Sequence, residues 1–566
     1  SSDLVGDYFK FREYITGFTG SAGTAVFTKD KAGLWTDGRY FIQAETQLKG
    51  SGIPLYKSGD SDVPTIEEFL KSELKEGDVL GFDGRTVTYA QGKRYCHIAD
   101  ENGASLKYSL DFAQNIWKER PEMSMESVFS LEDEYTGEKI GSKLERIREI
   151  MKENGCNAHV LSSLDDIAWL LNIRGNDIAY CPLVLSYAIV YNNSVELFAD
   201  IRKFSDDIIN LLAENQVKIY PYEDIYRKVS EMTSEDKLLL DSAIMNYSLY
   251  QAISKETVIV DKQNPEILMK SVKNETQAEN LRKAHLKDAV AHTKFMYWLK
   301  KNIGRVEITE LSASARLEGL RAEQEHFLGP SFGPISAYGE HGAIVHYSAD
   351  EKSNVPLKEG KLFMTDTGGH YLEGSTDITR TVALGEVGNI EKEHFTLVAR
   401  AMLRLANTVF LYGCSGANLD CIAREVFWKE GLNFNHGTGH GVGYLLNIHE
   451  GPINFRWKEG ERPAPALEEN MVITDEPGIY IEGSHGIRLE NELLVRKTVK
   501  NEYGQFMNFE ILTYVPIDLD AILPEKMSTE EKEMLNHYHK QVYEKVSPYL
   551  SEEERIWLKE YTRAVK

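Results

Sequence analysis

The chain has 566 residues, of which 42% are hydrophobic and 27% charged, and a formal net charge of −24. This length allows three or four domains of ~150 residues, and the composition is that of a folded globular protein. The negative charge disfavours nucleic acid and anionic membrane surfaces, because both are polyanions. No apolar run reaches the ~18 residues of a membrane span, so we expect neither nucleic acid nor membrane among the partners.

The cysteines indicate the redox environment. They number five and are sparse, with no C-x-x-C pair. Such an odd set favours a reducing compartment over a disulfide framework, so we expect five buried thiols and a cytoplasmic location. The chain starts with Ser-Ser-Asp, and a removed targeting segment would fit the alternative, an acidic digestive vacuole or lysosome-like compartment.

Two N-terminal regions repeat one order of elements. Residues 16–48 predict a strand, a turn, a second strand and a helix. Residues 158–204, at an offset near 160 residues, predict a helix, a glycine break, a strand, a turn and a strand. Strands alternating with helices predict α/β layers in both regions, although the low identity leaves a true duplication open. The predicted domains are 1–117, 118–272 and 273–566.

The third domain follows a predicted boundary near Pro265. Apolar residues at helical spacing predict a long helix over 275–302. Two Ser-x-x-Glu capping patterns, beginning at Ser528 and Ser551, predict two helices at the end of the chain.

Two acids of the third domain flank a Gly-Gly sequence. An apolar strand ends at Asp366, and a strand in which Ile378 and Val382 alternate with threonines follows Asp377. If these strands form the two arms of a hairpin, the carboxylates converge, because neighbouring strands lie ~5 Å apart. Aspartates near glycine also form turns, so the two acids alone leave a structural role open.

Three histidines occur in one glycine-rich segment. His436, His440 and His449 fall within 14 residues, whereas the whole chain has 15 histidines. Glycines allow sharp turns that bring imidazoles to a common centre. A single histidine is usually a core residue with satisfied hydrogen bonds, but three in a loop-like segment favour a functional site.

Further acids lie on predicted strands. Glu476 stands where Pro477 must end a strand. Alternation in the next strand places Arg488, Glu490 and Glu492 on one face. Buried glutamates are costly unless they are paired or bind metal. Arg488, near Glu490 in sequence, is suited to hydrogen-bond a metal ligand and so orient it.

Four carboxylates and one imidazole suit two divalent cations. Asp366, Asp377, Glu476 and Glu490 carry −4, which two M²⁺ ions would balance, and His440 adds one nitrogen. An oxygen-dominated shell with a single histidine favours Mn²⁺ or a similar ion. A water molecule would bridge two such ions ~3.5–4 Å apart. The ions would lower the pKa of this water, so that hydroxide forms near neutral pH.

These residues stand in motifs that resemble the aminopeptidase P family, the X-Pro aminopeptidases among the M24 "pita-bread" metallopeptidases. The resemblance runs along the whole chain and rests on GSAGTA, WTDGRYF, IAWLLNIRG, AIVHY, TDTGGHYLEGSTDITRT, HGTGHGVG, HEGP, DEPGIY and GIRLEN. It implies an α/β protein with two related N-terminal domains before a C-terminal pita-bread catalytic domain. It also implies a homodimer that removes the N-terminal residue from peptides with proline in second position.

The resemblance also implies roles for individual residues. His346, His436 and His449 would hydrogen-bond the substrate and the developing oxyanion, and Arg39 would contact substrate, with the neighbouring subunit's cleft as one option. His440 would serve one ion only, whereas Asp377 and Glu490 would bridge or chelate. The implied metal ligands are Asp366, Asp377, His440, Glu476 and Glu490.

For the mechanism we expect the bridging hydroxide to attack the Xaa-Pro carbonyl. Glu476 is our candidate for the proton shuttle from the water to the proline nitrogen. Two alternatives stay open: a prolidase that cleaves only Xaa-Pro dipeptides, and a catalytically inactive binding protein on the same scaffold. The two extra N-terminal regions disfavour the former, and the complete ligand set disfavours the latter.

Overall fold

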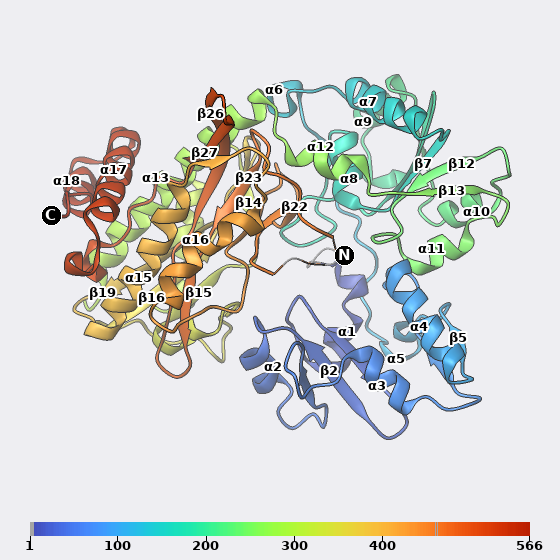
Figure 1. Cartoon of the computed structure of the whole chain (residues 1–566), viewed down its shortest axis with the longest axis horizontal. Coiled ribbons are helices and arrows are strands. Elements are labelled where there is room, and N and C mark those ends of the chain that lie inside the picture. Colours follow the sequence, from blue (N-terminus) through green and yellow to red (C-terminus); the bar gives the residue numbers. More distant parts are fainter. Residues whose placement is uncertain (1–4, 459, 461) are drawn as a thin grey trace. The chain divides into compact units, whose positions relative to one another are not determined.

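The computed structural model describes residues 5–458, 460 and 462–566. The chain divides into two compact units, Ser1–Lys270 and Ser271–Lys566 (Figure 1). The break lies beside the predicted start of the third domain, whereas the division of the first unit at 117/118 stays a prediction. No helix within the described ranges is both long and apolar enough to cross a membrane.

The first part of unit 1 forms the strand–turn–strand–helix predicted for residues 16–48. Strand β1 (Thr24–Phe27) pairs antiparallel with β2 (Ala32–Thr36), α2 (Phe41–Gln47) follows, and β3 (Leu55–Lys57) lies parallel to β2. Phe18 and Leu34 lie in its core. Its other helices and strands are α1 (Phe11–Thr16), α3 (Ile66–Glu73), β4 (Val79–Gly81), α4 (Tyr89–Glu101), β5 (Ser105–Lys107) and α5 (Phe112–Ile116).

The second part of unit 1 repeats this order around a larger sheet. Strands β9 and β10 are antiparallel, and β11 returns parallel to β10 after helix α9. The strand order is β11-β10-β9-β7-β12-β13. Its strands are β6 (Phe129–Ser130), β7 (Ala158–Leu161), β8 (Ile173–Arg174), β9 (Tyr187–Tyr191), β10 (Val195–Phe198), β11 (Val217–Tyr220), β12 (Lys237–Leu240) and β13 (Val258–Asp261). Its helices are α6 (Asp133–Thr136), α7 (Ile140–Glu153), α8 (Leu164–Leu170), α9 (Asp206–Glu214), α10 (Asp224–Ser230), α11 (Tyr247–Ala252) and α12 (Pro265–Ser271).

The helices of unit 2 follow the predictions closely. Helix α13 spans Glu275–Asn302 and buries Leu281, Ala284 and Phe295. Reciprocal capping boxes start the last two helices at Ser528 and Ser551, as predicted. The helices are α13, α14 (Glu310–Ala322), α15 (Asn389–Ala406), α16 (Gly416–Trp428), α17 (Thr529–Val546) and α18 (Glu552–Tyr561).

Antiparallel sheets of unit 2 position the candidate site. One has the order β15-β16-β19, and a larger one has the order β20-β27-β26-β23-β21-β22. Helix α15 packs on β23 and β25. Their strands are β15 (Ile335–Tyr338), β16 (Lys361–Thr367), β19 (Ile378–Leu384), β20 (Phe410–Leu411), β21 (Gly439–Gly441), β22 (Glu450–Phe455), β23 (Val472–Asp475), β26 (Asn491–Asn501) and β27 (Gly504–Ile511). Smaller pairings involve β14 (Phe327–Pro330), β17 (Gly369–Tyr371), β18 (Gly374–Ser375), β24 (Gly478–Ile481) and β25 (His485–Arg488).

The structure corrects some local expectations. Strand β16 continues past Asp366, and the short strands β17 and β18 lie between the two arms of the predicted hairpin in sequence. The arms β16 and β19 still pair directly. Thr379 and Thr381, which alternate with Ile378 and Val382 on β19, are fully buried. Alternation alone does not distinguish a solvated face from one that lines a buried polar site.

The cysteine prediction is only partly right. All five thiols are free, but only Cys156 and Cys181 are buried. Cys96 and Cys414 are partly exposed, and Cys421 is exposed on helix α16. The prediction of a buried thiol was therefore wrong for these three residues. Cys96 lies on helix α4, Cys414 just before helix α16, and Cys421 on helix α16. A helix at the surface turns one face to solvent.

Candidate metal centre

The first two candidate acids lie on neighbouring strands. Asp366 on β16 is opposite Thr379 on β19 in the antiparallel register, and Asp377 directly precedes β19. The Oδ2 atom of Asp366 accepts a hydrogen bond from Nη2 of Arg488 at 2.5 Å. Its Oδ1 atom is buried and has no hydrogen-bond partner among the described residues. One oxygen is therefore oriented by Arg488, and the other is available to a cation.

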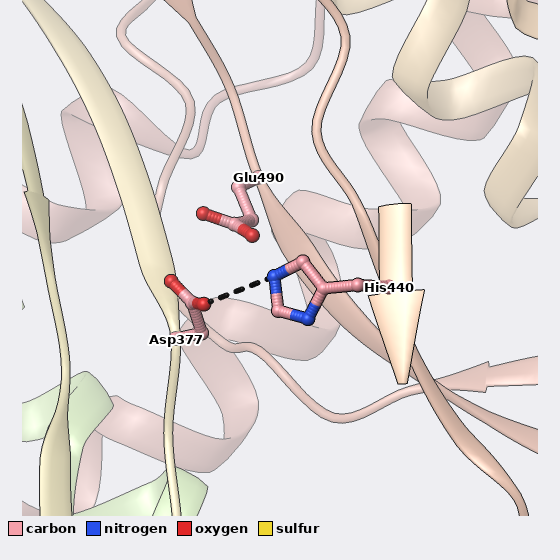
Figure 2. A group of neighbouring side chains, drawn as sticks. All are labelled: Asp377, His440 and Glu490. Atoms are coloured by element: carbon pink, nitrogen blue, oxygen red, sulfur yellow. Dashed lines mark ion pairs between the residues drawn. The ribbon is translucent and has the colours of Figure 1, made fainter. Parts of the chain in front are cut away.

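The imidazole and the glutamates come from the larger sheet and its continuation. His440 lies on β21, Glu476 follows β23, and Glu490 lies between β25 and β26. One ligand atom each of Asp377, His440 and Glu490 lies within 4.8 Å of the other two (Figure 2). The Nε2 atom of His440 is 3.5 Å from Asp377 Oδ2 and 3.7 Å from Glu476 Oε1. Segments far apart in sequence thus converge on one point.

Burial and mutual repulsion make this cluster unfavourable as free carboxylates. Desolvation, followed by the charges of neighbouring acids, raises the pKa values of Asp377 and Glu490 well above the usual range. Desolvation also raises the pKa of Glu476. Because crowded carboxylates cannot all ionise without a counter-charge, the donor set fits divalent cations.

Hydrogen bonds with residues outside the cluster orient these ligand candidates. The hydroxyl of Thr379 donates to Glu490 Oε2 at 2.7 Å and accepts from Arg488 Nε at 3.3 Å. The Nδ1 atom of His440 is 2.9 Å from the carbonyl oxygen of Gly441. If Nδ1 carries the proton, Nε2 is left as the ligand atom directed at the acids.

Two residues without an assigned role support Asp377. The backbone N–H of Asp377 donates to Glu492 Oε1 at 2.6 Å, and Glu492 Oε2 lies 3.1 Å from Nε2 of His285 on α13. Both side chains are fully buried. The alternation of the strand had placed Glu492 on the polar face, but His285 occurs in an ordinary helical pattern that carries no signal of its role.

His436 is held as a neutral imidazole beside the cluster. Its Nδ1 is 2.7 Å from the Gly437 carbonyl, which can only accept, so in the neutral ring Nε2 accepts from the hydroxyl of Tyr480 at 2.8 Å. The oxygen of this hydroxyl accepts from Arg488 Nη1 at 2.7 Å. Burial and the nearby Arg488 charge lower the pKa of His436 well below its usual value. Arg488 therefore connects the Asp366 side of the site with the His436 side.

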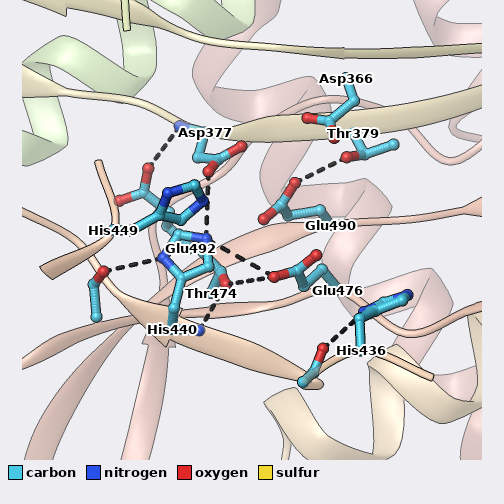
Figure 3. Close-up of polar contacts among 12 residues, drawn as sticks. Asp366, Asp377, Thr379, His436, His440, His449, Thr474, Glu476, Glu490 and Glu492 are labelled. Atoms are coloured by element: carbon cyan, nitrogen blue, oxygen red, sulfur yellow. Dashed lines mark hydrogen bonds and ion pairs between the residues drawn. The ribbon is translucent and has the colours of Figure 1, made fainter. Parts of the chain in front are cut away.

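The remaining candidates differ in their relation to the site. The ring of His449 meets the ring of His440 edge-on, with centroids 4.4 Å apart (Figure 3). His346 lies in a turn after a short 3-10 helix, close enough for its charge to affect His436. Arg39 belongs to unit 1, where its guanidinium pairs with Asp37 at 2.8 Å. The structure thus brings the unit 2 candidates close together, and the roles of these residues and of Arg39 stay predictions.

Comparison with protein families defines the class. The Creatinase/Prolidase N-terminal domain matches residues 10–107 and, as a second family, 119–277. Metallopeptidase family M24 matches 279–497, and the C-terminal region of peptidase M24 matches 505–565. Creatinase-type domains before an M24 domain describe a mixed α/β pita-bread metallopeptidase, which confirms the predicted fold class.

Whole-chain relatives narrow the class. Aminopeptidase P1 of Arabidopsis thaliana is 34% identical over 100% of this chain and 95% of its own length. Xaa-Pro aminopeptidase 1 of Dictyostelium discoideum is 36% identical over 96% and 88%. The crystal structure of X-prolyl aminopeptidase from Caenorhabditis elegans, described as a cytosolic enzyme with a di-nuclear active site, matches with a TM-score of 0.94 and 34% identity, covering 100% and 93%. The chain belongs to the Xaa-Pro aminopeptidase family of M24 metallopeptidases.

One solved dipeptidase structure covers part of this chain. The Xaa-Pro dipeptidase of Bacillus anthracis matches 67% of this chain and 99% of its own, with a TM-score of 0.54 and 24% identity. This likeness shows a common fold and no more.

Proposed function

We propose that this enzyme removes the N-terminal residue from peptides whose second residue is proline. The observation that carries the proposal is the buried meeting of Asp377, His440 and Glu490 in unit 2, with Glu476 beside them. It is supported by end-to-end similarity to proteins named Xaa-Pro aminopeptidase. An Xaa-Pro bond has no N–H on its nitrogen, so its recognition cannot depend on that donor.

In this proposal two divalent ions are held by the five residues that form the cluster. The unpartnered Asp366 Oδ1 and the raised carboxyl pKa values in the cluster fit such ions. When bound, the ions supply Lewis acidity and increase the acidity of a water molecule. We favour Mn²⁺ because the donors are mainly carboxylate oxygens with a single imidazole. The proposed ligands are Asp366, Asp377, His440, Glu476 and Glu490.

The chain's own groups then bind substrate and move the proton. Acidic side chains attract the positive α-amino group of the peptide and so place the first carbonyl in the site. Glu476 accepts the proton of the attacking water and delivers it to the proline nitrogen, a role suited to a carboxylate that lies beside the cluster, 3.7 Å from Nε2 of His440. His346 and His449 donate to the oxygen of the carbonyl as negative charge develops there.

The other residues orient this machinery. Neutral His436, fixed by Gly437 and Tyr480, lines the site. Arg488 orients Asp366 and is itself held by its contact with Tyr480. Arg39 is proposed to contact substrate, with a homodimer providing it from the neighbouring subunit as one arrangement. The proposed location is the cytoplasm, supported by the free thiols, with an acidic digestive vacuole as the alternative.

Activity with matched peptides tests the proposal. We expect hydrolysis of an Xaa-Pro-Yaa tripeptide, little or none of an Ala-Ala-Yaa control, and loss of activity with chelator that Mn²⁺ restores. Cleavage of Xaa-Pro dipeptides alone would instead indicate a prolidase. No hydrolysis by the metal-loaded protein would support the inactive scaffold and contradict the proposal.

The role of Glu476 needs a separate measurement. Glu476→Gln keeps the size and one oxygen of the side chain but cannot carry the proton. We expect kcat to fall about 10²- to 10⁴-fold while the metal content, measured by elemental analysis, stays within twofold of wild type. Near-normal turnover with normal metal content would refute the shuttle, whereas loss of metal would assign Glu476 to binding alone.

A further inference from the structure

The segment that carries His346 has little regular structure of its own. It connects β15 to β16 and contains the 3-10 helix η3 (Gly339–Ala343), after which His346 lies in a turn. A side chain placed on such a segment is only as well positioned as the contacts that fix the backbone. The question is therefore what holds residues 339–357 against the sheet.

A single buried carboxylate accepts four hydrogen bonds from this segment and the residue before it. Glu310, the first residue of α14, is 0% exposed. Its Oε1 atom accepts from the N–H of Tyr338 and from Nδ1 of His341, both at 2.8 Å. Its Oε2 atom accepts from the hydroxyl of Tyr347 at 2.9 Å and the N–H of Val355 at 3.3 Å. Three donors within the segment, together with the last residue of β15 directly before it, thus meet on one side chain.

Packing around Glu310 reinforces this arrangement. The rings of His341 and Tyr347, which both donate to Glu310, stack with centroids 4.5 Å apart. Tyr347 also packs in a small apolar cluster with Ile335, Ala337 and Met364. The hydrogen bond to Glu310 raises the pKa of His341, which favours its charged form. Hydrogen bonds with charged partners are stronger than neutral ones, so this carboxylate is a firm anchor.

The residues on either side of His346 connect this anchor to the candidate metal centre. The carbonyl of Val345 accepts from Nη2 of Arg488 at 3.3 Å, and the same atom of Arg488 donates to Asp366. Tyr347, on the other side, donates to Glu310. The backbone around His346 is therefore fixed from the metal side by Arg488 and from the α14 side by Glu310.

We propose that Glu310 is a positioning residue for the peptidase reaction, holding the segment 339–357 so that His346 faces the reacting peptide carbonyl. The inference rests on the proposed function, because it assigns Glu310 an effect through His346. Glu310 itself touches neither substrate nor metal in this assignment. Displacing a catalytic donor by ~1 Å can lower the rate about 10²-fold, so an anchor with four hydrogen bonds has a measurable effect.

The test compares Glu310→Gln with Glu318→Gln. Glu318 lies on the same helix but is exposed, so it controls for the chemistry of the substitution. For Glu310→Gln we expect kcat on an Xaa-Pro-Yaa peptide to fall about 10- to 100-fold, with KM within threefold and metal content unchanged. We expect amide hydrogen exchange in residues 339–357 to become about tenfold faster. The Glu318 variant should match wild type in all four measurements.

A double substitution separates a positioning role from general destabilisation. In a His346→Ala background, Glu310→Gln should lower kcat less than about twofold further, because the group it positions is already gone. If the two losses multiply, Glu310 acts by another route and the inference is wrong. If Glu310→Gln does not fold, Tyr347→Phe removes one of the four donors and should cause a smaller loss with the same non-additivity.

The outcomes distinguish this inference from the proposed function. A wild-type enzyme without activity on Xaa-Pro-Yaa peptides would refute the function. An active wild type together with a Glu310→Gln variant of equal kcat, and with unchanged exchange in 339–357, would refute the inference alone. Faster exchange with unchanged kcat would also overturn it, because the segment would then be anchored by Glu310 without consequence for the reaction.

Discussion

Metal binding to this enzyme should depend steeply on pH, and the structure gives the sign. In the metal-free protein, burial and neighbouring acids raise the pKa values of Asp377, Glu490 and Glu476. At any given pH a larger share of these carboxyl groups is therefore protonated than of ordinary carboxyl groups, although carboxylate is the form that binds a cation. Each ion must then displace protons, so metal binding becomes tighter as the pH rises.

Linkage gives the magnitude. A carboxyl whose folded-state pKa is raised stabilises the metal-free fold below its unfolded pKa, and this contribution is lost as the pH rises through the raised value. In the metal-bound form the same groups stay ionised, so this form has no such contribution to lose as the pH rises. Each proton displaced makes the metal affinity tenfold tighter per pH unit, about 1.4 kcal/mol. Two such carboxyls correspond to about 100-fold per pH unit across their titration.

Isothermal titration calorimetry measures this directly. Mn²⁺ is titrated into metal-free protein at a series of pH values above the ordinary carboxyl pKa of about 4, in buffers of different ionisation enthalpy, and the dependence on buffer gives the protons released. Because a water on the ions also releases a proton, Glu490→Gln is the necessary comparison. We expect this variant to release about one proton fewer than wild type.

The reasoning fails if the apparent affinity is independent of pH over this range. It also fails if wild type and Glu490→Gln release equal numbers of protons while both bind the ions. Either result would mean that the acids are already ionised in the metal-free protein, so that their crowding is relieved in some way other than by protonation.

Two further predictions concern structural support of the site. Lys273 and Glu450 form a buried ion pair at 2.5 Å. Lys273→Met removes the positive partner and leaves the charge of Glu450 buried without it. We expect about 3–5 kcal/mol lower stability by urea denaturation, partly recovered by adding Glu450→Gln; no recovery would contradict this. Gly486→Ala would place a Cβ atom 1.6 Å from the Gly342 carbonyl. It should cost about 1–3 kcal/mol, whereas Gly319→Ala, with no atom within 4 Å, should not destabilise.

Much of the architecture could be predicted because the relevant signals are local. The spacing of apolar residues predicted helix α13 with the observed bounds, and the Ser-x-x-Glu patterns predicted the starts of the last two helices. The strand preceding Glu476 ends before Pro477, as expected. Periodicity, capping and proline act over a few residues, so their effects can be recognised in the sequence without knowledge of the tertiary contacts.

The interior of the candidate site could be predicted only in part from the sequence. Residue type singled out Asp377, His440 and Glu490, which the structure brings together. It did not reveal Glu310, whose four donors lie 28 to 45 residues further along the chain. Nor did it reveal the contact between His285 and Glu492, because a buried histidine on a helix looks like an ordinary core position.

The amino-acid sequence by itself determined which groups were available: carboxylates on strands, imidazoles among glycines, and helices with defined ends. Only the tertiary structure decided which of them share a buried environment, and therefore which pKa values rise and which backbone segments are anchored. The physical reason is that desolvation and charge interaction depend on distance in space, whereas helix and strand signals depend on distance along the chain.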